Sequence, residues 1–581
     1  MRRPYQSKNW RILPGNPTQE AEIARHLGIS PILARLLVQR GIQTPEAAAR
    51  FLYPDQDHFH DPFLLPDAEV ACERLKTALS TQESILVHGD YDGDGVTSAA
   101  LWTRALRGLG GKVDVFVPHR KRDGYDMRVP IIEEAKANNV SIIVTTDCGI
   151  QRVDEVEHAR EQGIDVIITD HHTPKANGEL PKAVAVVNPH RRDSKYPFPH
   201  LAGVGVSFKL CEALTTYLGY PASMFRRKFL DLACIGTVTD IMPLMDENRI
   251  IVRDGLRALQ NTTKPGLKAL LHASIGMQRT VTATDIAFGL GPRLNAASRV
   301  DETRDALNLL MTKDPAEGQH LAQRLTELND QRREIQAKMM EEAMEEIAKT
   351  DTSESRCLVV SRSGWSGGLV GLVASKLSQQ FNRPCIVIGI DSKTGEGRGS
   401  ARSIEIFNIF DAINSCSELL IEYGGHAHAA GLSIRETNVV QFSRLMDQIA
   451  RNQLTEADLM PALEVAMEIG THEVSAKLLE ELELLAPYGH DNDMPFFVSR
   501  GLPIMNVTRM GKEQQHLKIL FRAEGLNGND CVEAVWWNQG YLADTLASLT
   551  SLDICYTMDF NNFQGARKIQ FKLCDIKPPE W

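Results

Sequence analysis

Between Ser84 and Pro189 the chain alternates short β-branched runs with amphipathic stretches, and this alternation limits the possible folds more than any other feature. The runs SILVH, VDVFVP, SIIVTTD, DVIITD and AVAVVNP are apolar enough for strands that are buried on both faces. Strands that alternate with helices form βαβ units, and βαβ units build a parallel sheet. Helical patterns follow at 208–217 and 226–237. We therefore predict an α/β domain with a parallel sheet over residues 76–313.

The rest of the chain divides into segments with different predicted secondary structure. Residues 1–75 have the pattern of a polar, helical N-terminal extension, and a helix with few breakers is predicted over 314–349, within a connecting segment 314–355. The runs CLVVS and PCIVIGI, followed by a glycine-rich region, predict a smaller α/β domain over 356–455. Short strands with turn signals between them, from PIMNVTRM to KIQFKLCDI, predict an OB-like β-barrel over 456–581.

Composition narrows the class of protein. With 64 Lys and Arg against 75 Asp and Glu the formal charge is −11, and 43% hydrophobic with 24% charged residues is typical of a soluble globular protein. This excludes a disordered, collagen-like or coiled-coil chain but allows a local basic channel. The 10 cysteines include no C-x-x-C pair, which indicates reduced thiols and predicts a cytoplasmic protein. No stretch approaches the roughly 18 apolar residues of a membrane span, so we expect no membrane insertion.

The strongest chemical signal is the run VHGDYDGDGVTS at the end of the first predicted strand. It contains one histidine and three aspartates, namely His88, Asp90, Asp92 and Asp94. The ends of parallel strands open into the crevice where α/β sheets bind ligands. A calcium-binding EF-hand loop would need a glutamate where Leu101 stands, and helix capping accounts for one aspartate but not for the whole set. The cluster therefore predicts a site for hard divalent cations.

Further carboxylates and imidazoles follow later strands and one helix. They are Asp147 in TTDCG, Asp170, His171 and His172 in ITDHHT, and Asp240 in IGTVTDIMPL. Each is weak evidence alone, because an aspartate at a strand end usually caps a helix and a lone histidine is usually structural. Successive parallel strands deliver such groups to one edge of the sheet, where carboxylates repel one another unless cations lie between them. The mixed set suits Mn²⁺, and also Mg²⁺ if fewer imidazoles bind.

The order of these motifs resembles that of the DHH phosphoesterase family, named for the residues that stand here as Asp170, His171 and His172. Further motifs resemble its bacterial branch of single-strand-specific 5′ to 3′ DNA exonucleases: DPFLLPD, VNP, LAGVGVSFKL, GPRLNAASR, GRGSARS and GGHAHAAG. The resemblance covers essentially the whole chain. It implies a DHH domain, a DHHA1 substrate-binding domain and a C-terminal OB domain. It also implies a metal-dependent exonuclease that degrades single-stranded DNA from the 5′ end to mononucleotides, in DNA repair and recombination.

The resemblance further implies a site for two divalent cations, Mn²⁺ or Mg²⁺. The implied ligands are His88, Asp90, Asp92, Asp147, His171 and Asp240. Asp147 would bridge the ions, His88 and Asp90 would complete one of them, and the remaining ligands would complete the other. Such a pair of ions lowers the pKa of a bound water and stabilises the attacking and leaving oxygens, so that hydrolysis needs no protein nucleophile.

His172 would face the scissile phosphate, and we assign it with Asp147 and Asp94 to the catalytic residues. Neighbouring side chains on an extended segment point in opposite directions. We therefore expect that His171 and His172 do not both bind the same ion.

Cationic side chains predict where the phosphates of a strand would bind. Arg120 in PHRKRDGYD occupies the place of a phosphate-binding arginine in the family, and Arg293 and Arg299 belong to the motif GPRLNAASR. A solvated loop is the alternative explanation for Arg120, and a structural ion pair is the alternative for each of the other two. In the second α/β domain the resemblance implies substrate binding by Arg398, Ser400, Arg402 and His426, for which tight packing of a glycine-rich turn is the alternative.

The barrel strands carry aromatic side chains among basic ones, as single-strand binding domains do. The aromatic residues are Trp536, Trp537, Tyr556, Phe560 and Phe563. Aromatic residues in strands usually belong to the core, and strand alternation allows at most one of the two tryptophans to face a ligand. Two departures from the family pattern concern the substrate path: Ser366 stands where relatives commonly carry histidine, and Asp126 adds a negative charge.

Three functions are compatible with these motifs. The first is the exonuclease, which implies single-stranded DNA as ligand, a monomer, and a single-strand binding protein and a RecQ-type helicase as partners. The second is a DHH phosphodiesterase or phosphatase for short oligonucleotides or small phosphorylated substrates, although such relatives are shorter and lack the barrel. The third is a scaffold that no longer binds metal, which the complete ligand set argues against.

Overall fold

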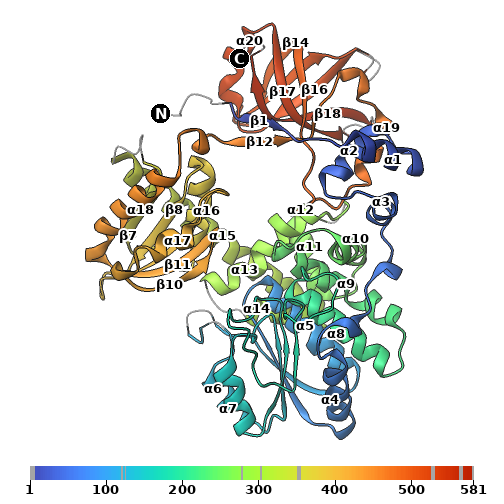
Figure 1. Ribbon diagram of the computed structural model, residues 1–581, viewed down its shortest axis with the longest axis vertical. Coiled ribbons are helices and arrows are strands. Elements are labelled where there is room, and N and C mark those ends of the chain that lie inside the picture. Colours follow the sequence, from blue (N-terminus) through green and yellow to red (C-terminus); the bar gives the residue numbers. More distant parts are fainter. Residues whose placement is uncertain are drawn as a thin grey trace. The chain divides into compact units, whose positions relative to one another are not determined.

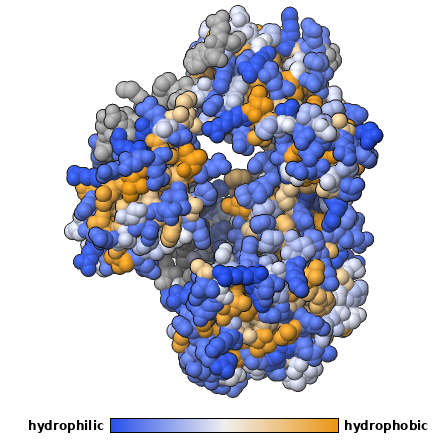
Figure 2. All heavy atoms as spheres, viewed as in Figure 1, coloured by the Kyte–Doolittle hydropathy of each residue, from blue (hydrophilic) through white to orange (hydrophobic). Residues whose placement is uncertain are grey.

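The computed structural model describes residues 7–119, 122–124, 126–276, 279–300, 304–349, 355–524, 526, 530–561 and 567–578 (Figure 1). The chain forms two compact units. The first comprises Met1–Ser298, Glu302–Leu325 and Glu464–Trp581, and the second comprises Arg299–Asp301 and Thr326–Leu463. On the face drawn in Figure 2 most of the surface is hydrophilic and apolar residues form separate patches. Each helix in the described ranges is too short or too polar to cross a lipid bilayer.

The predicted parallel sheet is confirmed in the first unit. Its order is β3-β2-β4-β5-β6, with every neighbouring pair parallel. The strands are β2 (Ser84–Gly89), β3 (Lys112–Phe116), β4 (Ile142–Thr146), β5 (Asp165–Thr169) and β6 (Ala185–Val187). The crossover helices are α5 (Gly93–Gly108), α6 (Val129–Ala137) and α7 (Val153–Glu161). β2 and β4 are buried along their whole length, which is why their apolar residues, ILV and IIV, are consecutive rather than alternating.

Helices complete the part of the first unit that follows the sheet. They are α8 (Gly203–Tyr217), α9 (Ala222–Thr239), α10 (Asp246–Gln260), α11 (Pro265–Ile275), α12 (Ala283–Asp285), the π-helical segment η3 (Ile286–Leu290), α13 (Gly291–Val300) and α14 (Arg304–Met311). α8 and α9 confirm the predicted helical patterns and pack on α5. Sequence periodicity did not identify α10 to α14.

The second unit holds the smaller α/β domain, and the long predicted helix is confirmed as α15 (Pro315–Lys349). Its sheet has the order β10-β11-β9-β8-β7, in which only β7 and β8 are parallel. The strands are β7 (Leu358–Ser363), β8 (Cys385–Ile390), β9 (Glu396–Arg402), β10 (Leu420–His426) and β11 (Ala429–Arg435). The helices are α16 (Val370–Phe381), α17 (Ile409–Asn414), η4 (Ser417–Leu419), η5 (Glu436–Asn438), α18 (Val439–Gln453) and η6 (Ala457–Leu459). The glycine-rich region thus forms antiparallel strands.

The OB-like barrel is confirmed at the C-terminal end of the first unit. β14 pairs with both β15 and β17, which closes the ring β14-β15-β16-β18-β17. Its strands are β14 (Phe497–Met510), β15 (His516–Arg522), β16 (Cys531–Trp536), β17 (Ser551–Asn561) and β18 (Lys568–Lys577). Around them lie β12 (Ala462–Val465), β13 (Met467–Glu468), η7 (Thr471–Glu473), α19 (Ala476–Glu483), η8 (Gly540–Leu542) and α20 (Ala543–Ala547).

The first part of the N-terminal segment, up to residue 52, packs against this barrel, whereas residues 62–64 and 68–81 pack on α8. Its elements are β1 (Asn9–Ile12), α1 (Pro17–Leu27), α2 (Pro31–Gln39), α3 (Pro45–Leu52), η1 (Gln56–His58), η2 (Pro62–Leu64) and α4 (Ala68–Thr81). β1 pairs with β12. Leu33 and Leu37 of α2 share one hydrophobic core with Leu479, Phe497 and Phe571. The two ends of the chain therefore fold together.

One buried arginine ties these parts of the first unit to the helices that follow the sheet. Arg249 of α10 donates hydrogen bonds to the backbone carbonyls of Phe51, Leu484, Leu485 and Ala486, at 2.7 to 2.9 Å. Its guanidinium also lies 3.9 Å from the centre of the Phe51 ring. Burial lowers the pKa of Arg249 to about 9, and the neighbouring Arg253 contributes to this lowering, so the side chain remains a cation at neutral pH.

Candidate metal centre

The charged residues gather where the strand order of the parallel sheet reverses. β2 has β3 on one side and β4 on the other, so β2 and β4 flank a topological switch point, where α/β sheets bind their ligands. Asp90 and Asp92 follow the end of β2, Asp147 follows β4, and the DHH triplet follows β5. Asp240 stands at the C-terminal end of α9.

The structure brings these side chains into one cluster. Three overlapping groups have ligand atoms within 4.8 Å of one another: Asp90, Asp92 and Asp147; Asp147, His171 and His172; and Asp94, His171 and Asp240. Asp147 and His171 each belong to two groups, so the groups are continuous. His88, the remaining predicted ligand, lies fully buried at the end of β2 and outside these groups.

Glycines allow this close approach. A Cβ on Gly203 would lie 2.5 Å from Asp147 Oδ1, and a Cβ on Gly95 would lie 2.6 Å from the backbone of Asp90. No other residue type fits either position without moving a candidate ligand. The motifs GDGVTS and LAGVG are therefore explained by packing around the carboxylates.

Asp94 uses both carboxylate oxygens to hold the start of α8. It accepts hydrogen bonds from the backbone N–H groups of Gly203 at 2.7 Å and Val204 at 2.8 Å. Burial and then repulsion from Asp92 raise the pKa of Asp94 to about 7. Because Gly203 abuts Asp147, this pair of bonds also fixes the surroundings of Asp147.

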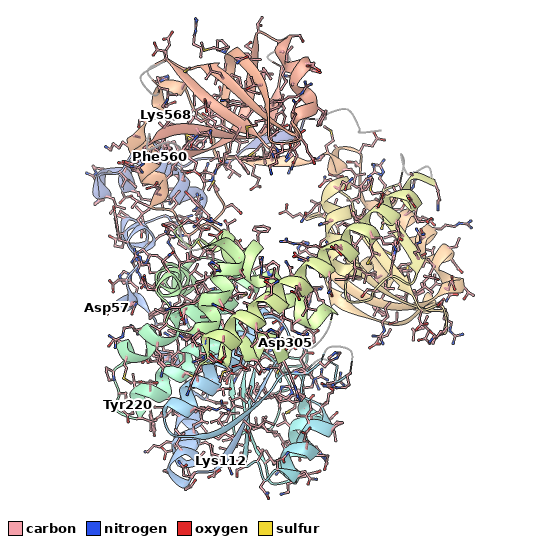
Figure 3. All side chains as sticks on the ribbon, turned by 180° about the vertical axis from the view of Figure 1, so that it is seen from behind. Asp57, Lys112, Tyr220, Asp305, Phe560 and Lys568 are labelled. Carbon is pink, nitrogen blue, oxygen red and sulfur yellow. The ribbon has the colours of Figure 1, made fainter. Side chains whose placement is uncertain are left out.

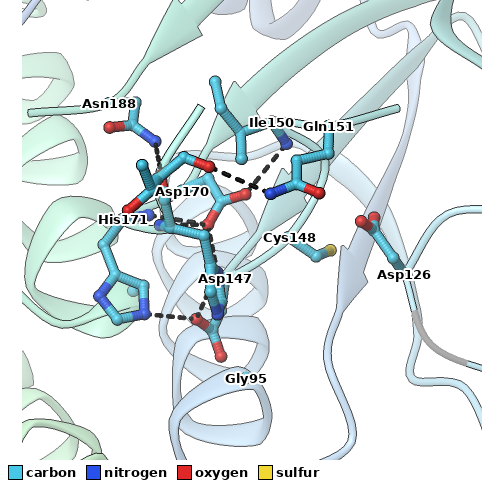
Figure 4. A network of polar contacts seen from close by, with 12 residues as sticks. Gly95, Asp126, Asp147, Cys148, Ile150, Gln151, Asp170, His171 and Asn188 are labelled. Carbon is cyan, nitrogen blue, oxygen red and sulfur yellow. Dashed lines mark hydrogen bonds and ion pairs between the residues drawn. The ribbon is translucent and has the colours of Figure 1, made fainter. Parts of the chain in front are cut away.

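Asp170 holds the loop of the DHH triplet in place through hydrogen bonds (Figure 4). Its carboxylate accepts hydrogen bonds from the backbone N–H groups of Ile150, His171 and His172, at 2.8 to 3.0 Å. A fourth bond, 2.7 Å long, joins it to His172 Nδ1. Burial raises the pKa of Asp170, but the bond to His172 and the charge of His172 outweigh burial and lower it. Asn188 of the VNP motif donates to the carbonyl of His172 at 2.9 Å and so holds the same loop.

The expectation that His171 and His172 point apart is wrong. Their ring centres lie 4.6 Å apart, His171 Nε2 lies 3.2 Å from Asp147 Oδ1, and His172 Nδ1 lies 4.0 Å from that oxygen. β5 ends at Thr169, so the two histidines follow a turn around Asp170 instead of the alternation of a strand. The His172 side chain is 43% exposed. Burial lowers its pKa, whereas the bond to Asp170 and nearby carboxylates raise it, to about 9.

The electrostatics of the cluster are those of a site built for cations. Burial, followed by mutual repulsion, raises the pKa values of Asp90, Asp147 and Asp240 well above the usual range. Burial lowers the pKa values of His88 and His171 to about 4, so both imidazoles are neutral at neutral pH. Neutral imidazoles and crowded carboxylates are the donor set of a divalent cation site.

Buried atoms that lack a hydrogen bond also indicate a divalent cation site. Over the described part of the chain, His88 Nε2, Asp90 Oδ1 and Asp147 Oδ1 are buried and take part in no hydrogen bond. Leaving such atoms unsatisfied costs roughly 1–3 kcal/mol each, and more where the group is charged. Divalent cations would coordinate all three atoms and cancel the repulsion between the carboxylates. The residues present therefore fit divalent metal ions.

The predicted phosphate-binding arginines have different positions. Arg120 lies outside the described residues. Arg293 is buried and donates to the backbone carbonyls of Gly289 at 2.8 Å and Ala273 at 3.2 Å, which ties η3 to α11. Arg299, in the second unit, donates to the carbonyl of Gly368 at 3.0 Å. These bonds occupy part of each guanidinium, and the role of Arg293 and Arg299 in binding a strand stays a prediction.

The substrate residues predicted in the second unit do lie together. Arg398, Ser400 and Arg402 alternate along β9 and therefore share one face of the sheet. Arg402 is paired through Ala429 of β11 with His426 of β10, so His426 stands on that face too. Arg402 donates to Ser400 Oγ at 3.0 Å.

The structure also shows the surroundings of Asp126 and of the barrel aromatics. Asp126 is buried 2.8 Å from Arg152 Nε, so its negative charge is compensated. Tyr556 is a core residue whose ring stacks on Phe571, with the ring centres 4.0 Å apart, so it cannot stack on a base. The two neighbouring tryptophans diverge as expected, since Trp536 is buried and Trp537 is 51% exposed.

Phe560 stands at the edge of the barrel near Lys568 (Figure 3). The guanidinium of Arg567 lies 3.7 Å from its ring centre. Phe563 lies outside the described residues. The open aromatic faces of the barrel are therefore fewer than the sequence indicated.

Sequence reasoning missed two residues that hold the site. Asn295 accepts a 2.7 Å hydrogen bond from the N–H of Gly93, at the start of α5, and Asn188 holds the DHH loop. Both stand in motifs that were recognised, LNA and VNP, but neither asparagine was given a role. Their presence within these motifs was the available signal, because an asparagine side chain can both donate to and accept from backbone groups.

Comparisons with known proteins agree with this geometry. Family models match the DHH family, N-terminal domain, over residues 84–237, the DHHA1 domain over 354–452 and the RecJ OB domain over 465–575. The single-stranded-DNA-specific exonuclease RecJ of Bacillus subtilis (strain 168) is 37% identical, covering 98% of this chain and 71% of the relative. RecJ of Escherichia coli (strain K12) is 32% identical over 95% of this chain and 96% of the relative.

Solved structures give the same result. The crystal structure of RecJ in complex with Mn²⁺ from Thermus thermophilus has a TM-score of 0.83 and 30% identity, covering 99% of this chain and 80% of that chain. The corresponding complex with Mg²⁺ has a TM-score of 0.77 and 28% identity, covering 99% of this chain and 79% of that chain.

Proposed function

This chain belongs to the RecJ family of single-stranded-DNA-specific exonucleases, and we propose that it hydrolyses single-stranded DNA from the 5′ end to mononucleotides in a metal-dependent reaction. The observation that carries the proposal is the cluster around Asp147, whose buried and half-buried carboxylates and imidazoles lie within reach of common ions and include buried atoms with no hydrogen bond. A role in DNA repair and recombination is part of the proposal.

We propose two divalent cations, Mn²⁺ or Mg²⁺, held by His88, Asp90, Asp92, Asp147, His171 and Asp240. Asp147 would touch both ions, which its membership of two groups supports. His88 and Asp90 would complete one ion, and their unpartnered Nε2 and Oδ1 atoms support this. When bound, the ions would lower the pKa of a water and stabilise charge on the scissile phosphate.

The remaining residues assigned to catalysis have separate proposed roles. His172 would contact the scissile phosphate, which the exposure of its ring and its bond to Asp170 support. Asp94 would act as a positioning residue, because both its oxygens already accept N–H groups of α8.

For the strand itself we propose contacts with Arg120, Arg293, Arg299, Arg398, Ser400, Arg402 and His426. The shared face of β9 and β10 supports the last four of them. Single-stranded DNA as the ligand is supported by the RecJ OB domain match.

The proposal also includes the organisation and setting of the protein. The segments are those defined from the sequence: 1–75, 76–313, 314–355, 356–455 and 456–581. We further propose a monomer in the cytoplasm, where a single-strand binding protein and a RecQ-type helicase would supply substrate. The free thiols of its cysteines support a reducing compartment.

The test is digestion of a long single strand labelled at either end, with Mn²⁺, beside matched blunt duplex and dinucleotide substrates. Asp147→Asn removes the shared carboxylate, and Asp165→Asn, at the opposite end of the same sheet, is the control. We expect mononucleotides from the 5′ end with the wild type and the control, no product with Asp147→Asn, and no digestion of blunt duplex. Release from the 3′ end would overturn the polarity, and cleavage of the dinucleotide alone would indicate a phosphodiesterase for small substrates.

A further inference from the structure

We propose that Cys148 is a positioning residue that holds His88 in the tautomer required for metal binding. The proposal rests on the proposed role of His88 as a metal ligand. It adds a residue that touches neither ion nor substrate and acts through the imidazole.

The thiol lies directly against the back of the imidazole. Cys148 Sγ is 3.6 Å from His88 Nδ1 and 3.8 Å from the carbonyl oxygen of His88, and both residues are fully buried. A thiol has one proton, and the geometry directs it to the carbonyl oxygen. The sulfur lone pairs then remain to accept a hydrogen bond from Nδ1–H.

This arrangement selects one tautomer. A neutral imidazole carries one N–H, so a proton on Nδ1 leaves the lone pair of Nε2 free. Among the described residues, Nε2 of His88 is buried and has no hydrogen-bond partner. The other tautomer would bury an unsatisfied N–H there. Metal-binding histidines generally have their second ring nitrogen held in this way, although usually by a carbonyl or a carboxylate.

The loop after β4 is shaped to deliver the sulfur. Asp147 has a positive φ of 62° and Gly149 one of 107°, conformations that turn the chain sharply on either side of Cys148. Thr145 Oγ1 donates to the carbonyl of Cys148 at 2.8 Å, and Ile150 N–H binds Asp170 at 3.0 Å. The same turn thus places a carboxylate in the metal cluster and a thiol behind His88.

The test is calorimetric titration of the full chain with Mn²⁺ in the absence of DNA. Cys148→Ala should weaken binding at the site that includes His88 by about 10- to 100-fold, the usual effect of removing a group that orients a metal ligand. Cys148→Ser keeps an acceptor and should lose less. Cys234→Ala is the matched control, because Cys234 is also fully buried and donates to a backbone carbonyl, at 3.6 Å, but bonds to no histidine among the described residues.

A double-mutant cycle separates positioning from general destabilisation. In a His88→Ala background, Cys148→Ala should have no further effect on Mn²⁺ affinity, and the melting temperature of the metal-free variants reports any loss of folding. Unchanged Mn²⁺ affinity in Cys148→Ala, or an equal loss with and without His88, would overturn this inference while leaving the proposed function intact. A wild type that binds no Mn²⁺ would overturn both.

Discussion

Removing the shared carboxylate should stabilise the metal-free protein while abolishing its response to metal. Asp147 is buried, and its ligand oxygen lies within 4.8 Å of those of Asp90 and Asp92. Burial and the charges of neighbouring carboxylates raise the pKa of Asp147 well above the usual range, so the ionised carboxylate is unfavourable without cations. Asp147→Asn keeps the shape of the side chain and removes the charge.

The magnitude follows from Coulomb's law. At an effective dielectric constant of about 20, two unit charges separated by about 5 Å repel by roughly 3 kcal/mol. Two such neighbours limit the total repulsion to about 7 kcal/mol, and the carboxyl groups relieve part of this repulsion by taking up protons. We expect Asp147→Asn to raise the free energy of unfolding by about 2 to 4 kcal/mol at pH 8 in EDTA.

Urea denaturation followed by circular dichroism measures this effect, in EDTA and in excess Mn²⁺. In EDTA the variant should unfold at higher urea than the wild type. In Mn²⁺ the order should reverse, because only the wild type gains binding free energy. Asp231→Asn is the control: Asp231 is also buried but lies 2.8 Å from Lys264 Nζ, so neutralising it should destabilise the protein in both buffers. If Asp147→Asn were less stable than the wild type in EDTA, the argument from repulsion would be refuted.

Four other predictions follow from single residues. The raised pKa of Asp94, about 7, means that between about pH 4 and 7 the folded state holds a proton that the unfolded state has released, so in EDTA the urea midpoint should fall as pH rises through this window. Arg249→Met should lower the free energy of unfolding by about 3 kcal/mol or more in urea, because four backbone carbonyls lose a charged donor and the bonds to Phe51 and Leu485 are buried. Ile241 is 70% exposed and has a positive φ of 58°, which is unfavourable for a β-branched residue, so Ile241→Gly should raise the free energy of unfolding by about 1 kcal/mol in urea. Trp536→Ala should cost about 3 to 5 kcal/mol by thermal melting, whereas Trp537→Ala should change stability by less than about 0.5 kcal/mol.

The parts of the fold that local patterns encode were predictable. β2, β4 and β5 are short apolar runs between helical patterns, and each ends at a polar motif, so strand, sheet type and sheet edge followed from the sequence. The barrel followed from several short strands with turns between them. α15 followed from a long stretch without breakers.

Long-range packing was not predictable in the same way. Leu33 and Phe497 are far apart in the chain yet share one core, and no local period specifies that partnership. The helices α10 to α14 lie in a mixed segment interrupted by Gly, Pro and Thr, where periodicity is weak. Tyr556 has the composition of a base-stacking residue, and only its burial on Phe571 shows that it belongs to the core.

Within the site, the sequence identified the aspartates but not which of them would bind metal and which hold the backbone in place. Asp90, Asp94, Asp147 and Asp170 are the same residue type at comparable strand or helix ends. Asp94 and Asp170 have oxygens that are occupied by backbone N–H groups, whereas Asp90 and Asp147 each retain a buried oxygen with no hydrogen bond. A carboxylate that is already satisfied positions the chain, and one that is not requires a cation. This distinction depends on the direction of N–H groups from α8 and from the loop after β4, which spacing along the sequence does not specify.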